Sequence, residues 1–408
     1  MKTVHRWVVS LSLATLVPAL ATAQELELPA GFTATVIHEG VGTARHLAVA
    51  DNGDVYVASR KGLMALRDAD GDGKLETVTP FGDVKGTEVR IHGDWLYVSD
   101  NVGVYRYPLR KGELAPTGTQ QTVVSQFPPE RQHADKTFAL DSKGTLYVNV
   151  GAPSNSCQKQ DRQEGSPGIN PCPILEKYGG VWVFDGNKLD QTPADGRRYA
   201  TGMRNAVAIE WNAGENALYA AIHGRDSLDT LFPALYTAVD NATRTAEEFH
   251  RITDGGDYGW PYAYWDTKLE KRIVTPEYGG DAKKAAPAGK YPDPLVAFPA
   301  HWAPNDLLFY EGKSFPANFQ GGAFIAFHGS WNRAPEPQAG YKVVFQPMKN
   351  GKPAGQYVEF ADGFAGTIED NSPSNADYRP VGLAVGPDGS LYISDSQKGR
   401  IWRVTYKK

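Results

Sequence analysis

The stretch VGLAVGPDGSLYISD, residues 381–395, decides the fold of this 408-residue chain. Its first half is mainly apolar, a polar turn follows at Asp388-Gly389, and a short aromatic strand is centred on Tyr392. Asp-Gly between two alternating apolar segments is a hairpin signal, because both residues tolerate the positive φ of a tight turn. The stretch therefore predicts two neighbouring strands of an antiparallel sheet.

Weaker copies of this unit precede it along the chain. They are LAVADNGDVYVAS (47–59), VRIHGDWLYVSD (89–100), FALDSKGTLYVNVG (138–151), VAIEWNAGENALYAAIHG (207–224) and, with a longer turn, LLFYEGKSFPANFQGGAFIAFHG (307–329). A repeated unit of about 40–50 residues is typical of the four-stranded blades of a β-propeller. No long apolar stripe of helical period competes with this pattern. The sequence predicts an all-β, six-bladed β-propeller with long inter-strand loops; a β-sandwich or a β-solenoid is the alternative.

The first 23 residues have the features of an export signal. Lys2 and Arg6 precede an uncharged stretch over 7–20, and Ala-Thr-Ala at 21–23 offers a cleavage site. The uncharged stretch is shorter than a typical membrane span, so we do not expect an integral membrane protein. We predict a signal peptide at 1–23 and one propeller domain at 24–408, located in the periplasm or outside the cell.

Cys157 and Cys172 are the two cysteines of the chain. In an oxidising compartment such a pair is expected to form a disulfide, and closing a loop of about 15 residues contributes about 3 kcal/mol in the chain-entropy picture. A free reactive thiol is the alternative. The C-x-x-C-H motif that attaches a c-type haem is absent from the sequence.

The charge pattern gives no sign of a nucleic-acid partner. The net charge is −5, and acidic and basic residues are interspersed along the chain. Proteins that bind phosphate backbones carry a stripe or patch of Lys and Arg instead.

His133 is the candidate catalytic residue. Functional residues of a propeller come from loops of different blades, and His133 lies just before the third of the repeats. Asp135 follows two residues later, so in an extended chain both side chains would face the same way. An imidazole beside a carboxylate can accept a hydroxyl proton as a general base. A surface histidine in a loop is the alternative.

Cationic residues precede other repeats in the same relative place. Arg204-Asn205 comes before the fourth repeat unit and Arg379 before the last. Guanidinium groups suit bidentate binding of carboxylates or phosphates, so these residues indicate an anionic ligand. Each could instead be an ordinary ion-pair partner.

Two aromatic segments could form walls of a binding site. They are GGDYGWPYAYW (255–265) and GSWNR (329–333). Aromatic side chains at this density can stack on a flat ligand or on a sugar face. Packing of long inter-blade loops is the alternative.

Together these segments resemble the soluble glucose/sorbosone dehydrogenase family, six-bladed propellers that use pyrroloquinoline quinone (PQQ). The similarity runs over most of the chain after the signal peptide, from LPAGFTATV (28–36) to YRPVGLAVGPDGSLYISD (378–395). GGDYGWP and the Arg204-Asn205 pair are its more specific parts. SPGINPCP (166–173) and GSWNR are more similar to the sorbosone-dehydrogenase-like branch.

The resemblance implies a role for each candidate residue. His133 would take the proton of a substrate hydroxyl while hydride passes from the same carbon to C5 of the quinone. Arg204, Asn205 and Arg379 match positions that hold the carboxylates and oxygens of the quinone. Positive groups there help because reduction places negative charge on the quinone oxygens.

The resemblance implies one calcium site, and an acidic motif suggests a second. The resemblance implies a Ca²⁺ bound by the cofactor and by main-chain carbonyls that match Gly224 and Arg225, where it would polarise the C5 carbonyl. A separate structural Ca²⁺ is suggested by D-A-D-G-D-G-K-L-E, whose carboxylates belong to Asp68, Asp70, Asp72 and Glu76. This motif matches only the first part of an EF-hand loop, and a simple acidic turn is the alternative.

Three positions depart from the family pattern. Gly151-Ala152 stands where glucose-oxidising members have Gly-Asp, so Asp135 or a more distant acid would have to orient the histidine. The family lysine that contacts the quinone has no clear counterpart, and Arg333 or His328 is the expected replacement. His301 is expected to bind the cofactor where a smaller hydroxyl residue is common.

The sequence thus favours a PQQ- and Ca²⁺-dependent oxidoreductase that oxidises an aldose or a related aldehyde or alcohol. Its electrons would pass to an external acceptor, a cytochrome or a quinone. Two other functions stay open on such a propeller: a Ca²⁺-dependent hydrolase of the lactonase type, and a non-catalytic domain that binds carbohydrate or protein. The sequence does not predict the oligomeric state.

Overall fold

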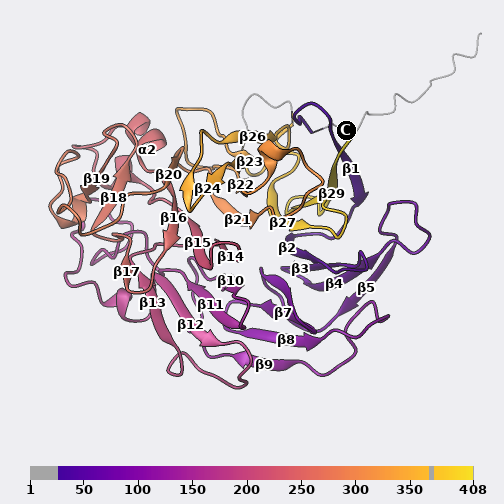
Figure 1. The fold of residues 1–408 in the computed structure, drawn as a ribbon. Coiled ribbons are helices and arrows are strands. Elements are labelled where there is room, and N and C mark those ends of the chain that lie inside the picture. Colours follow the sequence, from indigo (N-terminus) through magenta and orange to yellow (C-terminus); the bar gives the residue numbers. More distant parts are fainter. Residues whose placement is uncertain (1–25, 367–371, 408) are drawn as a thin grey trace, which may run out of the picture.

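The computed structural model describes residues 26–366 and 372–407. Six sheets surround a central channel, each with four antiparallel strands and one of them with an additional short parallel strand, which confirms the predicted six-bladed β-propeller (Figure 1). The signal-peptide segment lies outside the described residues and stays a prediction. Among the described residues, no helix has the length and apolar character needed to cross a membrane.

The first three blades follow each other along the chain, and each begins with its innermost strand. Blade 1 contains β2 (Ala44–Val49), β3 (Val55–Ser59), β4 (Gly62–Arg67) and β5 (Thr77–Phe81); blade 2 contains β6 (Val89–His92), β7 (Trp95–Ser99), β8 (Val104–Pro108) and β9 (Gln121–Val124); blade 3 contains β10 (Phe138–Leu140), β11 (Thr145–Val150), β12 (Gly180–Asp185) and β13 (Arg197–Thr201), with β17 (Gly256–Asp257) parallel to β13.

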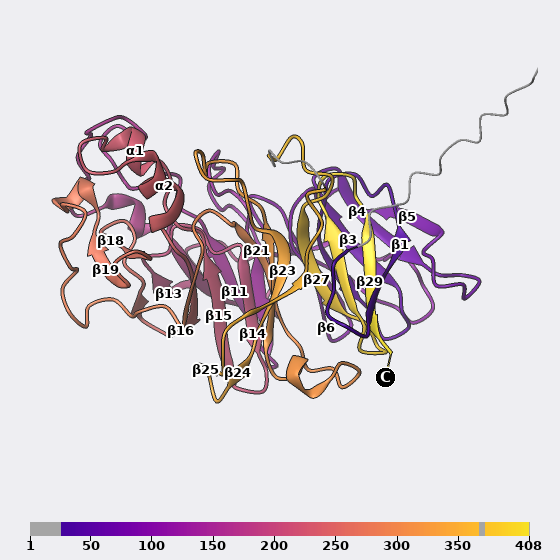
Figure 2. The ribbon, with the colours of Figure 1, turned by 90° about the horizontal axis from the view of Figure 1, so that it is seen from above.

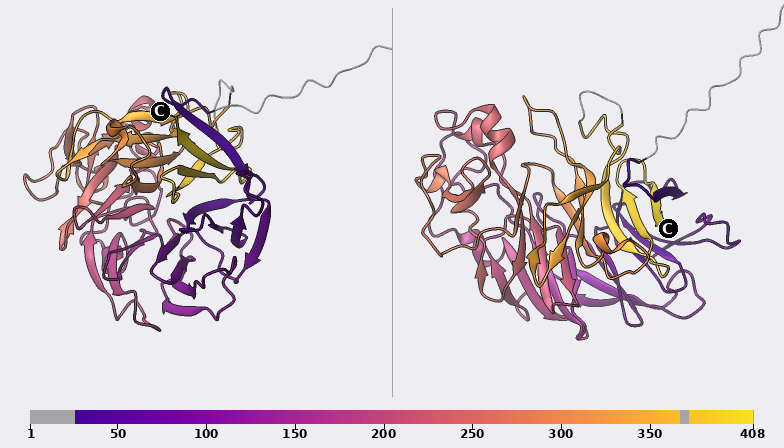
Figure 3. Two further views of the ribbon diagram at one scale, coloured as in Figure 1. Left: turned by 45° about the vertical axis from the view of Figure 1, so that its right-hand side comes forward. Right: turned by 45° about the horizontal axis from the view of Figure 1, so that its top comes forward.

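The last three blades complete the ring. Blade 4 contains β14 (Ala208–Asn212), β15 (Ala217–Ile222), β16 (Glu247–Ile252) and β20 (Val296–Phe298); blade 5 contains β21 (Pro304–Phe309), β22 (Ala323–His328), β23 (Tyr341–Gln346) and β26 (Val358–Ala361); blade 6 contains β27 (Pro380–Val385), β28 (Leu391–Asp395), β29 (Ile401–Tyr406) and β1 (Phe32–His38). Strand β1 pairs antiparallel with β29, so the two ends of the chain close one blade (Figures 1 and 3).

Each predicted repeat corresponds to the two innermost strands of a blade. The repeat at 381–395 forms β27 and β28, and the long-turn repeat forms β21 and β22 with a 3-10 turn at Ala317–Phe319 between them. The aromatic residues of the repeats pack between blades: Tyr147 of blade 3 stacks on Trp211 of blade 4 with 5.2 Å between ring centroids. The recurring aromatic residue is therefore a packing residue, and its burial holds neighbouring blades together.

Long excursions leave blades 3 and 4 on one side of the ring (Figure 2). Between β15 and β16 lie the short helices α1 (Leu228–Leu231) and α2 (Ala238–Arg244), and after β16 comes the hairpin of β18 (Ala263–Asp266) and β19 (Lys271–Val274). The segment between β11 and β12 carries the 3-10 turn Pro173–Glu176 and the disulfide between Cys157 and Cys172, as predicted. We call residues 152–178 the disulfide insert. Smaller elements are the 3-10 turn Pro276–Tyr278 and the hairpin of β24 (Met348–Lys349) and β25 (Lys352–Pro353).

Candidate active site

A cavity of about 510 Å³ opens at one end of the central channel and is lined by residues of all six blades. Most of the lining residues either precede or begin the innermost strand of a blade, or follow its second strand. Because these two strands are antiparallel, the start of one and the end of the next lie at the same edge of the sheet. For this reason His133, Arg204 and Arg379 meet in one cavity.

The imidazole of His133 is oriented by a main-chain carbonyl. Its Nδ1 lies 2.5 Å from the carbonyl oxygen of Ala152. Because a carbonyl only accepts, Nδ1 donates and Nε2 keeps its lone pair. Gly151 permits this close approach, since a Cβ at that position would lie 2.6 Å from the Cβ of His133. Ala152 stands where the family pattern has an aspartate, and its main-chain carbonyl orients His133 in place of that side chain.

The expectation that Asp135 would orient His133 is wrong. His133 has a φ of +53°, in the left-handed region, so the chain is not extended there and the two side chains do not form a pair. Asp135 instead makes ion pairs with Arg45 at 3.3 Å and with Arg60 at 2.8 Å. These two ion pairs hold its carboxylate in the wall of the cavity.

His133 is neutral at ordinary pH. Burial lowers its pKa to about 3, and the nearby charge of Arg204 adds to this effect, while the bond to Ala152 opposes it. A neutral imidazole with a free Nε2 is a proton acceptor. The imidazole therefore stays unprotonated over the whole physiological pH range, and its role as a general base stays a prediction.

The predicted cations line the cavity and form hydrogen bonds with other groups of its wall. Arg204 is 4 % exposed; it donates from Nη1 to the carbonyl of Gly224 at 2.9 Å and from Nη2 to Asp226 at 2.6 Å. Asn205 lies beside it in the lining. Arg379 donates to the carbonyls of His328 at 2.9 Å and Gly329 at 3.0 Å.

Four further arginines of the cavity were missed from the sequence: Arg45, Arg60, Arg131 and Arg162. Arg45 lies two residues before the first repeat, just as Arg379 lies two residues before the last, so the same signal predicts it. Arg162 belongs to the disulfide insert and reaches the cavity only through the tertiary fold, lying 3.3 Å from Asp226. Burial lowers the pKa of Arg45 to about 10, with Asp135 opposing.

Two buried carboxylates of the cavity were also missed. Asp226 accepts from Asn332 at 2.9 Å as well as from Arg204. Burial would raise its pKa, but Arg204, followed by His301, holds that pKa well below the usual value. Glu247 accepts from the amide of Gly224 at 3.0 Å, and burial raises its pKa. Neither residue belongs to one of the repeats, so the repeat pattern gives no signal for them.

The main chain at Gly224 faces the cavity, whereas the side chain of Arg225 does not. The carbonyl of Gly224 accepts from Arg204, and Gly224 lines the cavity. Arg225 is buried and paired with Glu277 at 2.6 Å. A role for the carbonyls of Gly224 and Arg225 in binding Ca²⁺ stays a prediction.

Two of the three remaining candidates for the cofactor site line the cavity. His301 donates from Nε2 to the carbonyl of Asn241 at 2.7 Å, and His328 lies 2.6 Å from the hydroxyl of Ser396. Burial and Arg379 hold the pKa of His328 well below its usual value. Arg333 lies outside the cavity, because its guanidinium donates to the carbonyls of Ala242, Ala300 and Pro337 and so braces a loop.

The aromatic segments have different environments. Trp331 of GSWNR lines the cavity and is 61 % exposed. Trp260 of the other segment is 7 % exposed and packs with Ala152, Cys157 and Cys172. The first can meet a ligand, and the second packs the disulfide insert against its neighbours.

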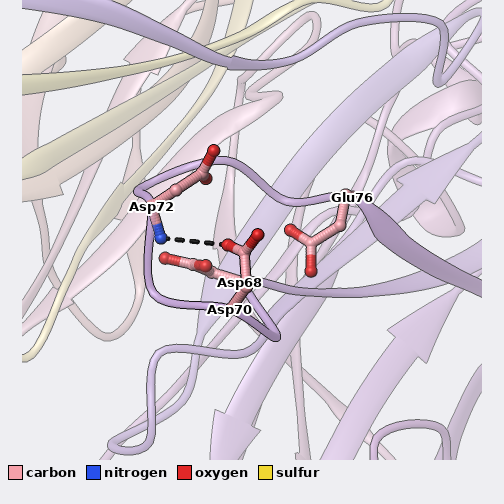
Figure 4. Close-up of side chains that lie close together, drawn as sticks. All are labelled: Asp68, Asp70, Asp72 and Glu76. Carbon is pink, nitrogen blue, oxygen red and sulfur yellow. Dashed lines mark hydrogen bonds between the residues drawn. The ribbon is translucent and has the colours of Figure 1, made fainter.

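The acidic loop, drawn in Figure 4, contributes no residue to the lining of the cavity. Asp68, Asp70, Asp72 and Glu76 place one oxygen each within 4.8 Å of one another. The same carboxylates accept bonds from amides of their own loop, such as that of Gly71 to Asp68 at 2.7 Å. A structural Ca²⁺ at this loop stays a prediction.

Two relatives share part of the sequence of this chain. The chain is 30% identical over 281 residues to an uncharacterized protein of Borreliella burgdorferi, covering 68% of this chain and 62% of that protein. It is 26% identical over 281 residues to the pyrroloquinoline quinone-dependent pyranose dehydrogenase of Coprinopsis cinerea, covering 59% of this chain and 36% of that protein. The chain thus spans less than two thirds of the length of these relatives.

Solved structures share the fold at lower identity. The calcium structure of the Trichoderma reesei family AA12 enzyme superposes with a TM-score of 0.76 at 20% identity, over 95% of this chain and 98% of that one. The holo form of the pyranose dehydrogenase PQQ domain from Coprinopsis cinerea gives 0.73 at 20% identity, over 94% and 97%. The family model described as TrAA12-like matches residues 26–407. The chain therefore belongs to the TrAA12-like family of propellers.

Proposed function

We propose that the protein is a PQQ-dependent dehydrogenase that oxidises an aldose or a related alcohol or aldehyde. The observation that supports this most is the composition of one cavity: six arginines face four carboxylates around a neutral histidine. The Coprinopsis relative is named as PQQ-dependent. A cationic cavity with a built-in base suits oxidation of a hydroxyl beside an anionic cofactor.

The residues of the cavity fit PQQ, which carries several carboxylates. Arg204 is buried, and its Nε has no hydrogen-bond partner among residues 26–366 and 372–407. Arg204, Arg379 and Asn205 would hold the carboxylates and oxygens of the cofactor, with His301 and His328 beside them. Main-chain carbonyls of Gly224 and Arg225 would bind the accompanying Ca²⁺. When bound, the quinone supplies an electrophilic carbon, C5, that accepts hydride.

His133 carries the proton step. Its Nδ1 is engaged by Ala152, so Nε2 takes the proton of the substrate hydroxyl as the C–H bond of the same carbon is broken. The substrate loses a proton and a hydride and becomes a carbonyl compound or, from a cyclic aldose, a lactone. Two electrons then leave to an external cytochrome or quinone. We place this reaction in the periplasm or outside the cell, where the predicted export signal and the disulfide belong.

The geometry does not favour the lactonase-type alternative. Such a hydrolase needs carboxylates converging on an axial metal ion, whereas Asp226 is engaged by Arg204 and Asn332. In the part of the chain that the structure describes, the His, Cys, Asp and Glu groups close enough to hold a metal together are those of the acidic loop.

The test is reconstitution of purified apoprotein with PQQ and Ca²⁺, followed by the quinone absorption spectrum and dye reduction with a panel of aldoses and aldehydes. We expect a spectral change and dye reduction with at least one sugar. The His133→Ala variant should keep the spectral change and lose about 100-fold or more of turnover, the usual contribution of a general base. Absence of both signals in the unmodified protein would exclude the proposal; unchanged turnover in the variant would exclude His133 as the base.

A further inference from the structure

The side chain of Asn155, in the disulfide insert, forms hydrogen bonds with both the amide and the carbonyl of Asp226. Its Oδ1 accepts from the amide of Asp226 at 3.0 Å, and its Nδ2 donates to the carbonyl of Asp226 at 2.9 Å. The side chain thus imitates the paired bonds that one strand makes to another. Asn155 is 0% exposed, so water does not compete for these bonds.

Residues 224–226 form an irregular segment between β15 and α1, which we call the 224–226 turn, and Gly224 and Asp226 of this segment line the cavity. Gly224 offers its carbonyl to Arg204 at 2.9 Å and its amide to Glu247 at 3.0 Å. The carboxylate of Asp226 reaches Arg204 from the same turn at 2.6 Å. The turn 224–226 is therefore held from the cavity side by charged groups, and from the other side by Asn155.

Asn155 is itself anchored within the insert. Its amide donates to Asp161 at 3.1 Å, and Ser154 donates to the same carboxylate at 2.6 Å. Its carbonyl accepts from the indole of Trp260 at 2.8 Å. The disulfide closes the loop just beyond, at Cys157. A well-anchored amide can hold a neighbouring turn in one conformation, because its own movement is restricted.

We infer that Asn155 is a positioning residue that fixes the 224–226 turn. It thereby fixes the carbonyl of Gly224, which would receive the cation, and the carboxylate of Asp226, which holds Arg204 where the cofactor would bind. What the turn receives rests on the function proposed above. That Asn155 holds the turn rests on the hydrogen bonds alone. The two parts can be tested separately.

Two variants separate the contributions of the two hydrogen bonds that the side-chain amide of Asn155 forms. Asn155→Ala removes both bonds, whereas Asn155→Asp keeps an acceptor for the amide of Asp226 and loses the donor to its carbonyl. Gln191→Ala is the matched control: its buried amide donates to the carbonyls of Val123 and Asp185, away from the cavity. The melting temperature of each variant is measured as well. A decrease that Gln191→Ala shares with the Asn155 variants reports general destabilisation, and the effects of the Asn155 variants are judged relative to this control.

The first measurement is hydrogen exchange of apoprotein at the amide of Asp226. We expect exchange at least about 10-fold faster in Asn155→Ala, little change in Asn155→Asp, and no change in Gln191→Ala. The second is the Ca²⁺ concentration that gives half of the quinone spectral change at saturating PQQ, which should rise about 10-fold or more in both Asn155 variants and stay constant in the control.

Unchanged exchange at Asp226 in Asn155→Ala would overturn the inference. Faster exchange with an unchanged Ca²⁺ requirement would overturn the link between the turn and ligand binding. If the unmodified protein shows no quinone spectrum at all, the proposed function fails, and the exchange measurement still decides whether Asn155 fixes the turn.

Discussion

Glu210 should make the stability of the propeller depend on pH near neutrality. It lies on β14, lines a cavity separate from the candidate active site, and forms an ion pair with Arg90. Burial raises the pKa of Glu210 to about 7; Arg90 opposes this effect, whereas the carboxylates of Asp306 and Glu88 add to it. His46, which pairs with Glu88 at 2.9 Å, completes the charged groups of this cluster.

The size of the effect follows from the pKa difference. A carboxyl whose pKa is higher in the folded than in the unfolded protein binds its proton more tightly when folded. The free energy of unfolding should therefore fall as the pH rises from 4.5, the ordinary value, to about 7. A difference of one in pKa corresponds to about 1.4 kcal/mol, so this group accounts for about 3 kcal/mol.

The Glu210→Gln variant tests this reasoning, because glutamine has the shape of the protonated acid and does not ionise. We expect the variant to gain about 3 kcal/mol relative to the unmodified protein between pH 4.5 and pH 8. Urea unfolding followed by tryptophan fluorescence at several pH values measures this difference. Glu164→Gln, in an exposed part of the insert, is the control and should show no such trend. A stability difference that stays constant with pH, or that falls as the pH rises, would refute the argument.

Three further predictions follow from the site and from the closure of the ring. Arg204→Lys should raise the PQQ concentration needed for half of the spectral change about 10-fold or more, because lysine cannot reach two partners with a planar fork; an unchanged value would contradict the role of Arg204. Asp135→Asn should lower the melting temperature and leave the pH profile of turnover unchanged, since Asp135 pairs with Arg45 and not with His133; a shifted profile would restore Asp135 as a partner of the base. Phe32→Ala in the closing strand should cost about 3–5 kcal/mol in urea unfolding, because its ring packs 4.8 Å from Phe315 and is 9 % exposed; a loss below about 1 kcal/mol would show that β1 contributes little to ring closure.

The repeated unit allowed the blade architecture and part of the site to be predicted. Hairpin signals act over a few residues, so they are legible in a single stretch such as 381–395. Equivalent positions in different repeats must lie at the same edge of the ring, and this placed Arg204 and Arg379 in one cavity. Arg45 occupies the equivalent position before the first repeat and lines the same cavity.

Other parts of the site could be decided only by the tertiary structure. The orienting partner of His133 is the backbone carbonyl of Ala152, and a main-chain carbonyl has no signature in the sequence. Asp135 and Arg333 carry the right charges near the right motifs, yet their partners come from segments far away along the chain. Sequence by itself determined the six blades and the equivalent cationic positions, because both depend on local repetition. The tertiary structure decided which neighbouring side chains actually meet, because that depends on how loops from different blades pack.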